Sequence, residues 1–324
     1  MLRLDFIYDE RNMDELEAER CITQIVDAPD TVKAAFLTAL YIKGITPEEL
    51  SGFSKGIRKL SSISIKVKGL TDIVGTGGDH KNTINVSTAA SILLSSKIKI
   101  AKHGNFGITG SHGSADLMKF LGYKFDMTEN EILNNINEKN YVYILATMYN
   151  QTFARFSNVR KKLGIKTVFN ILGPLTNPLD PDKLVLGAYD DETAEVYASV
   201  ILKQGKRAFI VSSTMDEISP EEDSHIYYVS NGIRKFDLNP IDVAGKKINE
   251  SNIIEKDPVK SFNIVIDAFK NRNGDAASFI ALNAAPALVL NDISKDIKSA
   301  YDLCINEIES GNAYKQLRRI FNED

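Results

Sequence analysis

The sequence predicts an α/β protein with two parts: a small all-helical domain and a larger domain built on a mostly parallel central sheet flanked by helices. The chain has 324 residues, which is room for about two domains. Apolar residues recur at helical spacing through residues 1–65, with no strand-like run. From residue 71 onward, short strand-like runs alternate with helical stretches, the βαβ order typical of parallel sheets.

Composition excludes several classes of protein. With 39 Lys and Arg against 43 Asp and Glu, the net charge of −4 offers no basic field for nucleic acid or an anionic membrane. Cys21 and Cys304 are too few and too far apart for a disulfide framework. The N-terminus turns acidic at once, unlike a signal peptide, and no apolar run approaches the roughly 18 residues of a membrane span. We therefore expect a cytoplasmic protein with no nucleic-acid or membrane partner.

The helical domain carries clear start and stop signals. The stretch 34–43 is rich in Ala and Leu, and Gly44 follows it as a C-terminal glycine would. Thr46-Pro-Glu-Glu49 then combines an N-cap, a proline at the first helical position and an acidic first turn. These signals predict a helix on each side of Gly44.

The sheet of the larger domain is predicted from apolar runs of strand length. Strands are expected at residues 71–74, 98–101, 141–145, 183–186, 207–211 and 263–266, and helices at 88–94, 193–202 and 296–309.

A glycine-rich turn follows the first of these strands. In Gly75-Thr-Gly-Gly-Asp79 the glycines let backbone N–H groups approach an anion such as phosphate. The run matches neither G-x-G-x-x-G nor the Walker pattern. Asp79 would repel phosphate, so it suits ribose hydroxyls or a metal ion. A plain tight turn remains the alternative.

The next helix begins with the polar run Thr83-Ile-Asn-Val-Ser-Thr88. Ser and Thr at a helix start are usually caps. A helix N-terminus beside a glycine-rich turn is also a common anion site, so both interpretations stay open.

Two later strand ends carry further polar groups. Lys102-His-Gly-Asn105 follows the strand at 98–101, where a lysine can neutralise phosphate. Glycines recur at every third position from Gly104 to Gly113, which predicts a flexible substrate loop that also holds His103 and His112.

Asp216-Glu217 follows the strand at 207–211 and has the oxygen ligands that Mg²⁺ prefers. A solvated acidic pair is the alternative there.

Together these runs resemble the anthranilate phosphoribosyltransferase family. Matching blocks occur in family order at residues 72–79, 85–88, 102–105 with 113–116, 158–164, 169–178, 216–217 and 282–285. Nucleoside phosphorylases carry a related glycine-rich loop, but their Lys-x-Ser-x-Arg site is absent here.

The resemblance implies a fold and a reaction. A helical domain of residues 1–65, with an inserted segment near 160–185, would be hinged to an α/β domain of residues 66–159 and 186–324, and homodimers would form through the helical part. The reaction would move the phosphoribosyl group of phosphoribosyl pyrophosphate to the amine of anthranilate, with inversion at C1, in tryptophan biosynthesis.

The resemblance also implies the site residues, none of them a covalent nucleophile. Phosphoribosyl pyrophosphate would be held by Gly75, Gly78, Asp79, Thr83, Asn85, Val86, Ser87, Thr88, Lys102, Gly104, Asn105 and Ser114. Two Mg²⁺ ions would be ligated by Ser87, Asp216 and Glu217. Anthranilate would meet Gly75, His103, Asn105 and Arg160.

Departures from the family pattern lie on the acceptor side. A histidine of the family is Asn150 here, and Phe106 and Ser111 stand where relatives carry basic residues. These departures leave open a different aromatic amine as acceptor. A non-catalytic paralogue that binds nucleic acid is the other alternative, which the acidic net charge disfavours.

Overall fold

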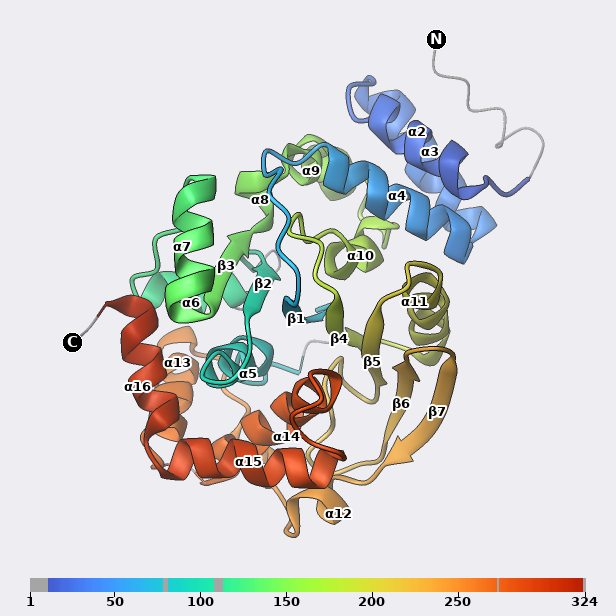
Figure 1. Ribbon diagram of the computed structural model, residues 1–324. Helices are drawn as coiled ribbons and strands as arrows, with labels where there is room; N and C mark the ends of the chain where they lie inside the picture. The colour runs from blue at the N-terminus through green and yellow to red at the C-terminus, as the bar shows by residue number, and fades with distance from the viewer. Residues whose placement is uncertain (1–10, 78–80, 108–112, 273, 323–324) are drawn as a thin grey trace. The chain divides into compact units, whose positions relative to one another are not determined.

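The computed structural model describes residues 11–77, 81–107, 113–272 and 274–322, and the chain divides into two compact units. Met1–Lys66 and Ala146–Asp180 form the helical unit, and Val67–Leu145 and Pro181–Asp324 form the α/β unit. The predicted combination of an all-helical part and an α/β part is therefore confirmed (Figure 1).

The helical unit is built from short amphipathic helices. It contains α2 (Glu15–Ile25), α3 (Asp30–Lys43), α4 (Pro47–Lys59), α8 (Ala146–Tyr149), α9 (Gln151–Leu163), α10 (Phe169–Leu172) and the 3₁₀ turn η1 (Gly173–Leu175). The predicted signals act as expected: Gly44, with φ of 81°, ends α3, and Thr46 caps α4 in a reciprocal pair with Glu49.

The second segment of the helical unit differs from the predicted one. It runs from Ala146 to Asp180, whereas the family pattern implied residues near 160–185. Its start lies earlier because α8 and α9 pack in the helical unit, where Ser62 N donates to Tyr149 O at 2.9 Å. Its end lies earlier because Lys183 already begins a strand of the sheet.

The α/β unit holds one seven-stranded sheet in the order β3-β2-β1-β4-β5-β6-β7. The strands are β1 (Thr71–Gly75), β2 (Ile100–Gly104), β3 (Tyr141–Leu145), β4 (Lys183–Ala188), β5 (Arg207–Ser212), β6 (Ser224–Val229) and β7 (Ile233–Leu238). The first five are parallel, whereas β6 and β7 extend the sheet as an antiparallel hairpin that the sequence patterns did not predict.

One predicted strand is wrong. Residues 263–266 lie inside helix α13 (Pro258–Phe269), which Asp257 caps. Phe262, Val265 and Phe269 are buried at helical spacing, so packing overrides the β-branched character of the run.

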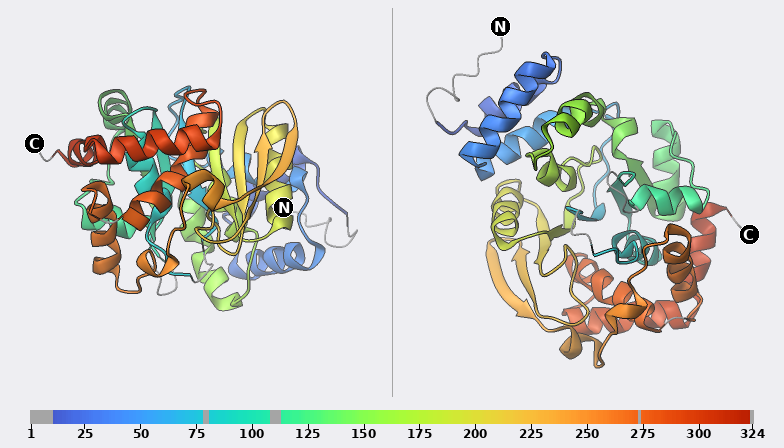
Figure 2. Two further views of the ribbon diagram at one scale, coloured as in Figure 1. Left: turned by 90° about the horizontal axis from the view of Figure 1, so that it is seen from below. Right: turned by 180° about the vertical axis from the view of Figure 1, so that it is seen from behind.

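Helices cover both faces of the sheet. Besides α13, the helices of the α/β unit are α5 (Val86–Leu94), α6 (Ser114–Phe120), α7 (Glu129–Lys139), α11 (Asp191–Lys203), α12 (Pro240–Ala244), η2 (Glu250–Asn252), α14 (Gly274–Leu290), α15 (Ile297–Glu309) and α16 (Asn312–Phe321). The almost fully buried α14 packs on β4, β5, α5 and α15, and α11 covers the opposite face (Figures 1 and 2). Within the described ranges, no helix has both the length and the apolar character needed to cross a membrane.

Candidate active site

The carboxyl ends of the parallel strands bring most of the predicted site residues to one edge of the sheet, where open α/β sheets bind ligands. A small pocket lies at this edge. Its lining comes from β1 (Ile73, Val74, Gly75), α5 (Val86, Ser87), β4 (Val185, Gly187), β5 (Val211), α14 (Asn283) and the segment with Asp216 and Glu217.

The position of Asp216 explains two glycines of the site. Its Oδ2 accepts a hydrogen bond from Gly77 N at 2.6 Å, so the glycine-rich turn donates to a carboxylate of the protein itself. A methyl group at Gly75 would overlap the Asp216 side chain, and one at Gly187 would overlap its backbone. Both glycines are therefore required for Asp216 to lie against the strand ends. Gly78 and Asp79, two predicted donor residues, lie outside the described residues.

The segment after β5 is held in place by α14. Asn283 Oδ1 accepts from Ile218 N at 2.8 Å, and its Nδ2 donates to Ile218 O at 3.3 Å. Ser213 Oγ also lies 2.8 Å from each of the carbonyl oxygens of Met215 and Glu217, within hydrogen-bond reach of both. Asp216 and Glu217 therefore lie on a segment whose backbone is held by Ser213 before them and by Asn283 after them.

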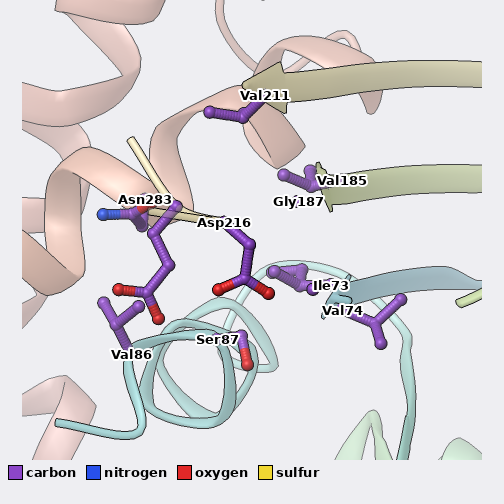
Figure 3. A pocket seen from close by; sticks show the side chains of 11 residues that line it. Ile73, Val74, Val86, Ser87, Val185, Gly187, Val211, Asp216 and Asn283 are labelled. Atoms are coloured by element: carbon purple, nitrogen blue, oxygen red, sulfur yellow. The ribbon is translucent and has the colours of Figure 1, made fainter. Parts of the chain in front are cut away.

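The start of α5 faces these carboxylates. Figure 3 shows the Asp216 carboxylate between the strand ends that carry Val211 and Gly187 and the helix that carries Ser87. Thr83 Oγ1 donates to Glu217 Oε2 at 3.1 Å. The N-cap residue of α5 is Asn85, whose side chain makes no capping hydrogen bond, so Ser87 is not the cap that one interpretation of the sequence required. Thr88 Oγ1 is buried with no hydrogen-bond partner among the described residues.

Lys102 lies buried beside the same carboxylates. Its side chain is 1% exposed, and its Nζ donates a long hydrogen bond of 3.4 Å to His103 O. Burial lowers the pKa of the Lys102 amine to about 8, while the negative charges of Asp72, Asp216 and Glu217 oppose that shift. His103 is also buried, and its backbone N donates to Asp72 Oδ1 at 3.1 Å. An ammonium has three donors, so Lys102 retains the capacity to bind an anion.

A second group of predicted residues meets at the end of β2. Ser114 Oγ lies 2.7 Å from Tyr143 Oη, and Gly104 has no side chain that would separate them. Asp116 Oδ2 accepts from Gly107 N at 3.0 Å and from Gly113 N at 2.8 Å, which fixes both flanks of the predicted substrate loop. The middle of that loop, including His112, lies outside the described residues.

Among the residues that the structure describes, no group of three or more His, Cys, Asp or Glu side chains is placed to hold a metal ion. The pocket instead brings together the predicted ligands, which are the carboxylates of Asp216 and Glu217 and the hydroxyl of Ser87. Such a partial set of oxygen ligands fits Mg²⁺, which keeps several waters and shares substrate phosphates as ligands.

Comparisons with known proteins agree with this architecture. A family model described as "Glycosyl transferase family, helical bundle domain" matches residues 5–61, and one described as "Glycosyl transferase family, a/b domain" matches residues 67–314. An anthranilate phosphoribosyltransferase of Picrophilus torridus is 81% identical over 324 residues, which cover 100% of both chains. The chain belongs to the anthranilate phosphoribosyltransferase family.

Solved members of the family have the same fold. The anthranilate phosphoribosyltransferase of Thermus thermophilus superposes with a TM-score of 0.93 at 27% identity, covering 100% of this chain and 99% of that one. The Saccharomyces cerevisiae enzyme in complex with PRPP and Mg gives a TM-score of 0.87 at 26% identity, covering 99% and 97% of the two chains.

The family residue Arg160 lies on α9 of the helical unit. Its guanidinium lies 5.5 Å from the ring centre of Phe169, and Nη2 donates to Asn170 Oδ1 at 3.4 Å. Burial lowers the pKa of the Arg160 guanidinium, which stays charged at any working pH. Among the described residues, this guanidinium donates one hydrogen bond, the long one to Asn170.

Asn150, which replaces a histidine of the family, has a structural position. It is fully buried, its Nδ2 donates to Ile57 O at 2.6 Å, and its Oδ1 caps α9 by accepting from Thr152 N at 3.0 Å. Phe106, another departure, packs edge-on against Phe125 with ring centres 5.8 Å apart.

Three residues that support the site were missed from the sequence as site residues. Asp72 holds His103, Asn283 holds the segment after Glu217, and Tyr143 contacts Ser114. Asp72 and Asn283 lie within blocks shared with the family, whereas Tyr143 was assigned only to a strand.

Proposed function

We propose that this chain transfers the phosphoribosyl group of phosphoribosyl pyrophosphate to the amine of anthranilate, yielding N-(5-phosphoribosyl)anthranilate and pyrophosphate in tryptophan biosynthesis. The observation that carries the proposal is the meeting of Asp216, Glu217, Ser87 and Lys102 at one sheet edge, in a chain that belongs to this family.

Ser87, Asp216 and Glu217 would hold Mg²⁺, two ions per subunit. Bound there, the metal would neutralise negative charge on the pyrophosphate and so make it a better leaving group. Oxygen ligands from the fixed segment after β5 and from the start of α5 support this assignment.

The phosphoribosyl donor would lie along the starts of α5 and α6. Gly75, Gly78, Asp79, Thr83, Asn85, Val86, Ser87, Thr88, Lys102, Gly104, Asn105 and Ser114 would bind it. The buried Lys102 ammonium and the Thr88 hydroxyl, which has no hydrogen-bond partner in the part of the chain that the structure describes, support the proposal. Both groups cost free energy unless an anionic or polar ligand satisfies them.

Gly75, His103, Asn105 and Arg160 would bind anthranilate, with the planar guanidinium of Arg160 paired to the carboxylate. The amine nitrogen then forms its bond to C1 while the bond from C1 to the pyrophosphate oxygen breaks, with inversion. Binding and orientation suffice for such a displacement, so no side chain needs to act as a covalent nucleophile.

Substitution of Arg160 tests the acceptor site. We expect Arg160→Ala to raise the KM for anthranilate about 30-fold, since a charged hydrogen-bond pair is lost, while the KM for phosphoribosyl pyrophosphate stays near its original value. Lys161→Ala, one position along α9, is the control and should change neither constant. A rise confined to the donor KM would show that Arg160 binds the other substrate.

The enzyme would work as a homodimer in the cytoplasm. Exposed apolar side chains on the helical unit support an interface there, with Tyr41 60% and Ile42 78% exposed on α3. The free, buried Cys21 and Cys304 suit a reducing compartment.

The decisive assay follows the loss of anthranilate fluorescence with purified protein, Mg²⁺ and phosphoribosyl pyrophosphate. We expect a decay that requires both the donor and Mg²⁺. If the protein binds the donor but anthranilate fluorescence persists, a different aromatic amine is the acceptor.

A further inference from the structure

Three elements of the α/β unit converge on one hydrogen bond at the edge of the site. Tyr143 comes from β3, Ser114 begins α6, and Gly104 ends β2. The oxygens of Tyr143 and Ser114 are 2.7 Å apart, and a methyl group at Gly104 would overlap both of them. The hydrogen bond between Tyr143 and Ser114 can therefore form only because Gly104 has no side chain in that space.

The two partners differ in their exposure. Tyr143 is 0% exposed, whereas Ser114 is only half buried and can meet a ligand. The ring of Tyr143 is enclosed by Tyr123 and Phe125, with ring centres 6.1 Å and 5.6 Å away. Its backbone N also donates to Tyr123 Oη at 2.8 Å, so both the ring and the strand that carries it are held.

The direction of the hydrogen bond follows from the ligand. A phosphate group offers oxygens that accept, so Ser114 must donate its single hydroxyl proton to bind one. Ser114 Oγ is then left to accept, and Tyr143 is the donor beside it. Burial raises the pKa of the Tyr143 phenol, which therefore keeps its proton at any working pH.

We propose that Tyr143 is a positioning residue, whose hydroxyl donates to Ser114 and holds the serine proton toward a phosphate oxygen of the phosphoribosyl donor. This inference rests on the proposed function, in which Ser114 binds that donor. A serine hydroxyl otherwise rotates freely, and a fixed second partner removes that freedom before the ligand arrives.

Tyr143→Phe tests the inference, because it deletes the hydroxyl and keeps the ring that packs against Tyr123 and Phe125. We expect the KM for phosphoribosyl pyrophosphate to rise about threefold to tenfold, the range for one hydrogen bond, while kcat and the KM for anthranilate stay within about twofold. Tyr141→Phe is the matched control: it lies two residues away on β3, is equally buried, and its hydroxyl contacts Met118 Sδ instead. It should leave the donor KM unchanged.

The double variant separates positioning from stability. In a Ser114→Ala background, Tyr143→Phe should raise the donor KM no further, because the hydroxyl it orients is gone. A donor KM that stays unchanged in Tyr143→Phe but rises in Ser114→Ala overturns the inference and leaves the proposed function standing. A donor KM unchanged in Ser114→Ala refutes the donor role of Ser114 and the inference with it. Equal effects of Tyr143→Phe and Tyr141→Phe on KM and on the unfolding midpoint would show that the hydroxyl is only structural.

Discussion

Glu49 in the helical unit and Lys102 in the α/β unit are both buried charges, but they differ in their hydrogen-bond partners. In the helical unit, the fully buried Glu49 accepts hydrogen bonds from Lys43 Nζ at 2.7 Å, Met13 N at 2.9 Å and Thr46 N at 3.0 Å. In the α/β unit, the equally buried Lys102 makes one long hydrogen bond among the described residues, to His103 O at 3.4 Å. Burial of a charge therefore does not by itself mark a site; the number of its partners within the protein separates a structural charge from one that awaits a ligand.

The largest effect on activity is expected when the carboxylates of Asp216 and Glu217, which lie beside Lys102, are both removed. We expect Asp216→Asn with Glu217→Gln to lower kcat/KM by about 10³-fold or more, because neutral amides are poor ligands for Mg²⁺. The unfolding midpoint should change little, since the Asn oxygen can still accept from Gly77 N. Steady-state kinetics and thermal unfolding of the same preparation provide both numbers.

Glu221→Gln with Glu222→Gln is the control, since these acidic residues are exposed and only a few positions downstream. If the variant at Asp216 and Glu217 retains near-normal activity, the metal assignment is wrong.

Substitution of Glu49 should lower stability without affecting substrate binding, the opposite of what we expect for Asp216 and Glu217. We expect Glu49→Ala to lower the free energy of unfolding by about 3 kcal/mol, because Lys43 and two backbone N–H groups lose their buried acceptor. The KM values for both substrates should remain unchanged in the folded protein. Urea unfolding measures the loss, and Glu48→Ala on the same helix serves as a control. A change in KM without a loss of stability would place Glu49 in the site.

Most of the fold could be predicted from sequence because the signals are local. Strand-like runs followed by helices predicted all five parallel strands, and the caps at Gly44 and Thr46 follow from the chemistry of single turns. The run at 263–266 was misassigned because Phe262 and Val265 on α13 pack against neighbouring helices, and no local pattern reports that contact.

The site residues also differ in whether a local sequence signal could predict them. Asp216 and Lys102 could be predicted because parallel strands end at one edge, so polar residues after separate strands must meet there. Asn283 binds Ile218 across 65 positions of sequence, and Tyr143 reaches Ser114 across 29. Only the folded sheet brings such pairs together, which is why both roles were invisible in the sequence.

Lys102 provides the counterpart to Glu49. We expect Lys102→Met to change the free energy of unfolding by no more than about 1 kcal/mol, because removing the desolvation cost of the buried ammonium offsets the lost attraction of Asp72, Asp216 and Glu217. The donor KM should rise about 30-fold, since a charged hydrogen bond to phosphate is lost. Lys99→Met, at a nearby half-buried position where the amine donates to Asn137 Oδ1, is the control. Destabilisation by several kcal/mol would mean that Lys102 is a structural charge like Glu49.

The smallest expected effect tests the start of α5. Ser87 is not the cap of this helix, so Ser87→Ala should change the free energy of unfolding by less than the roughly 1 kcal/mol that a lost cap costs. We expect the Mg²⁺ concentration for half-maximal activity to rise about tenfold, because one oxygen ligand of a sparse set is gone. Ser91→Ala, one turn along the same helix, separates a metal ligand from a general helix effect, since its hydroxyl bonds to Thr88 O instead. A thermal shift with unaltered Mg²⁺ dependence would make Ser87 a purely structural residue, and the contrast between the units would then rest on Lys102 and the two carboxylates.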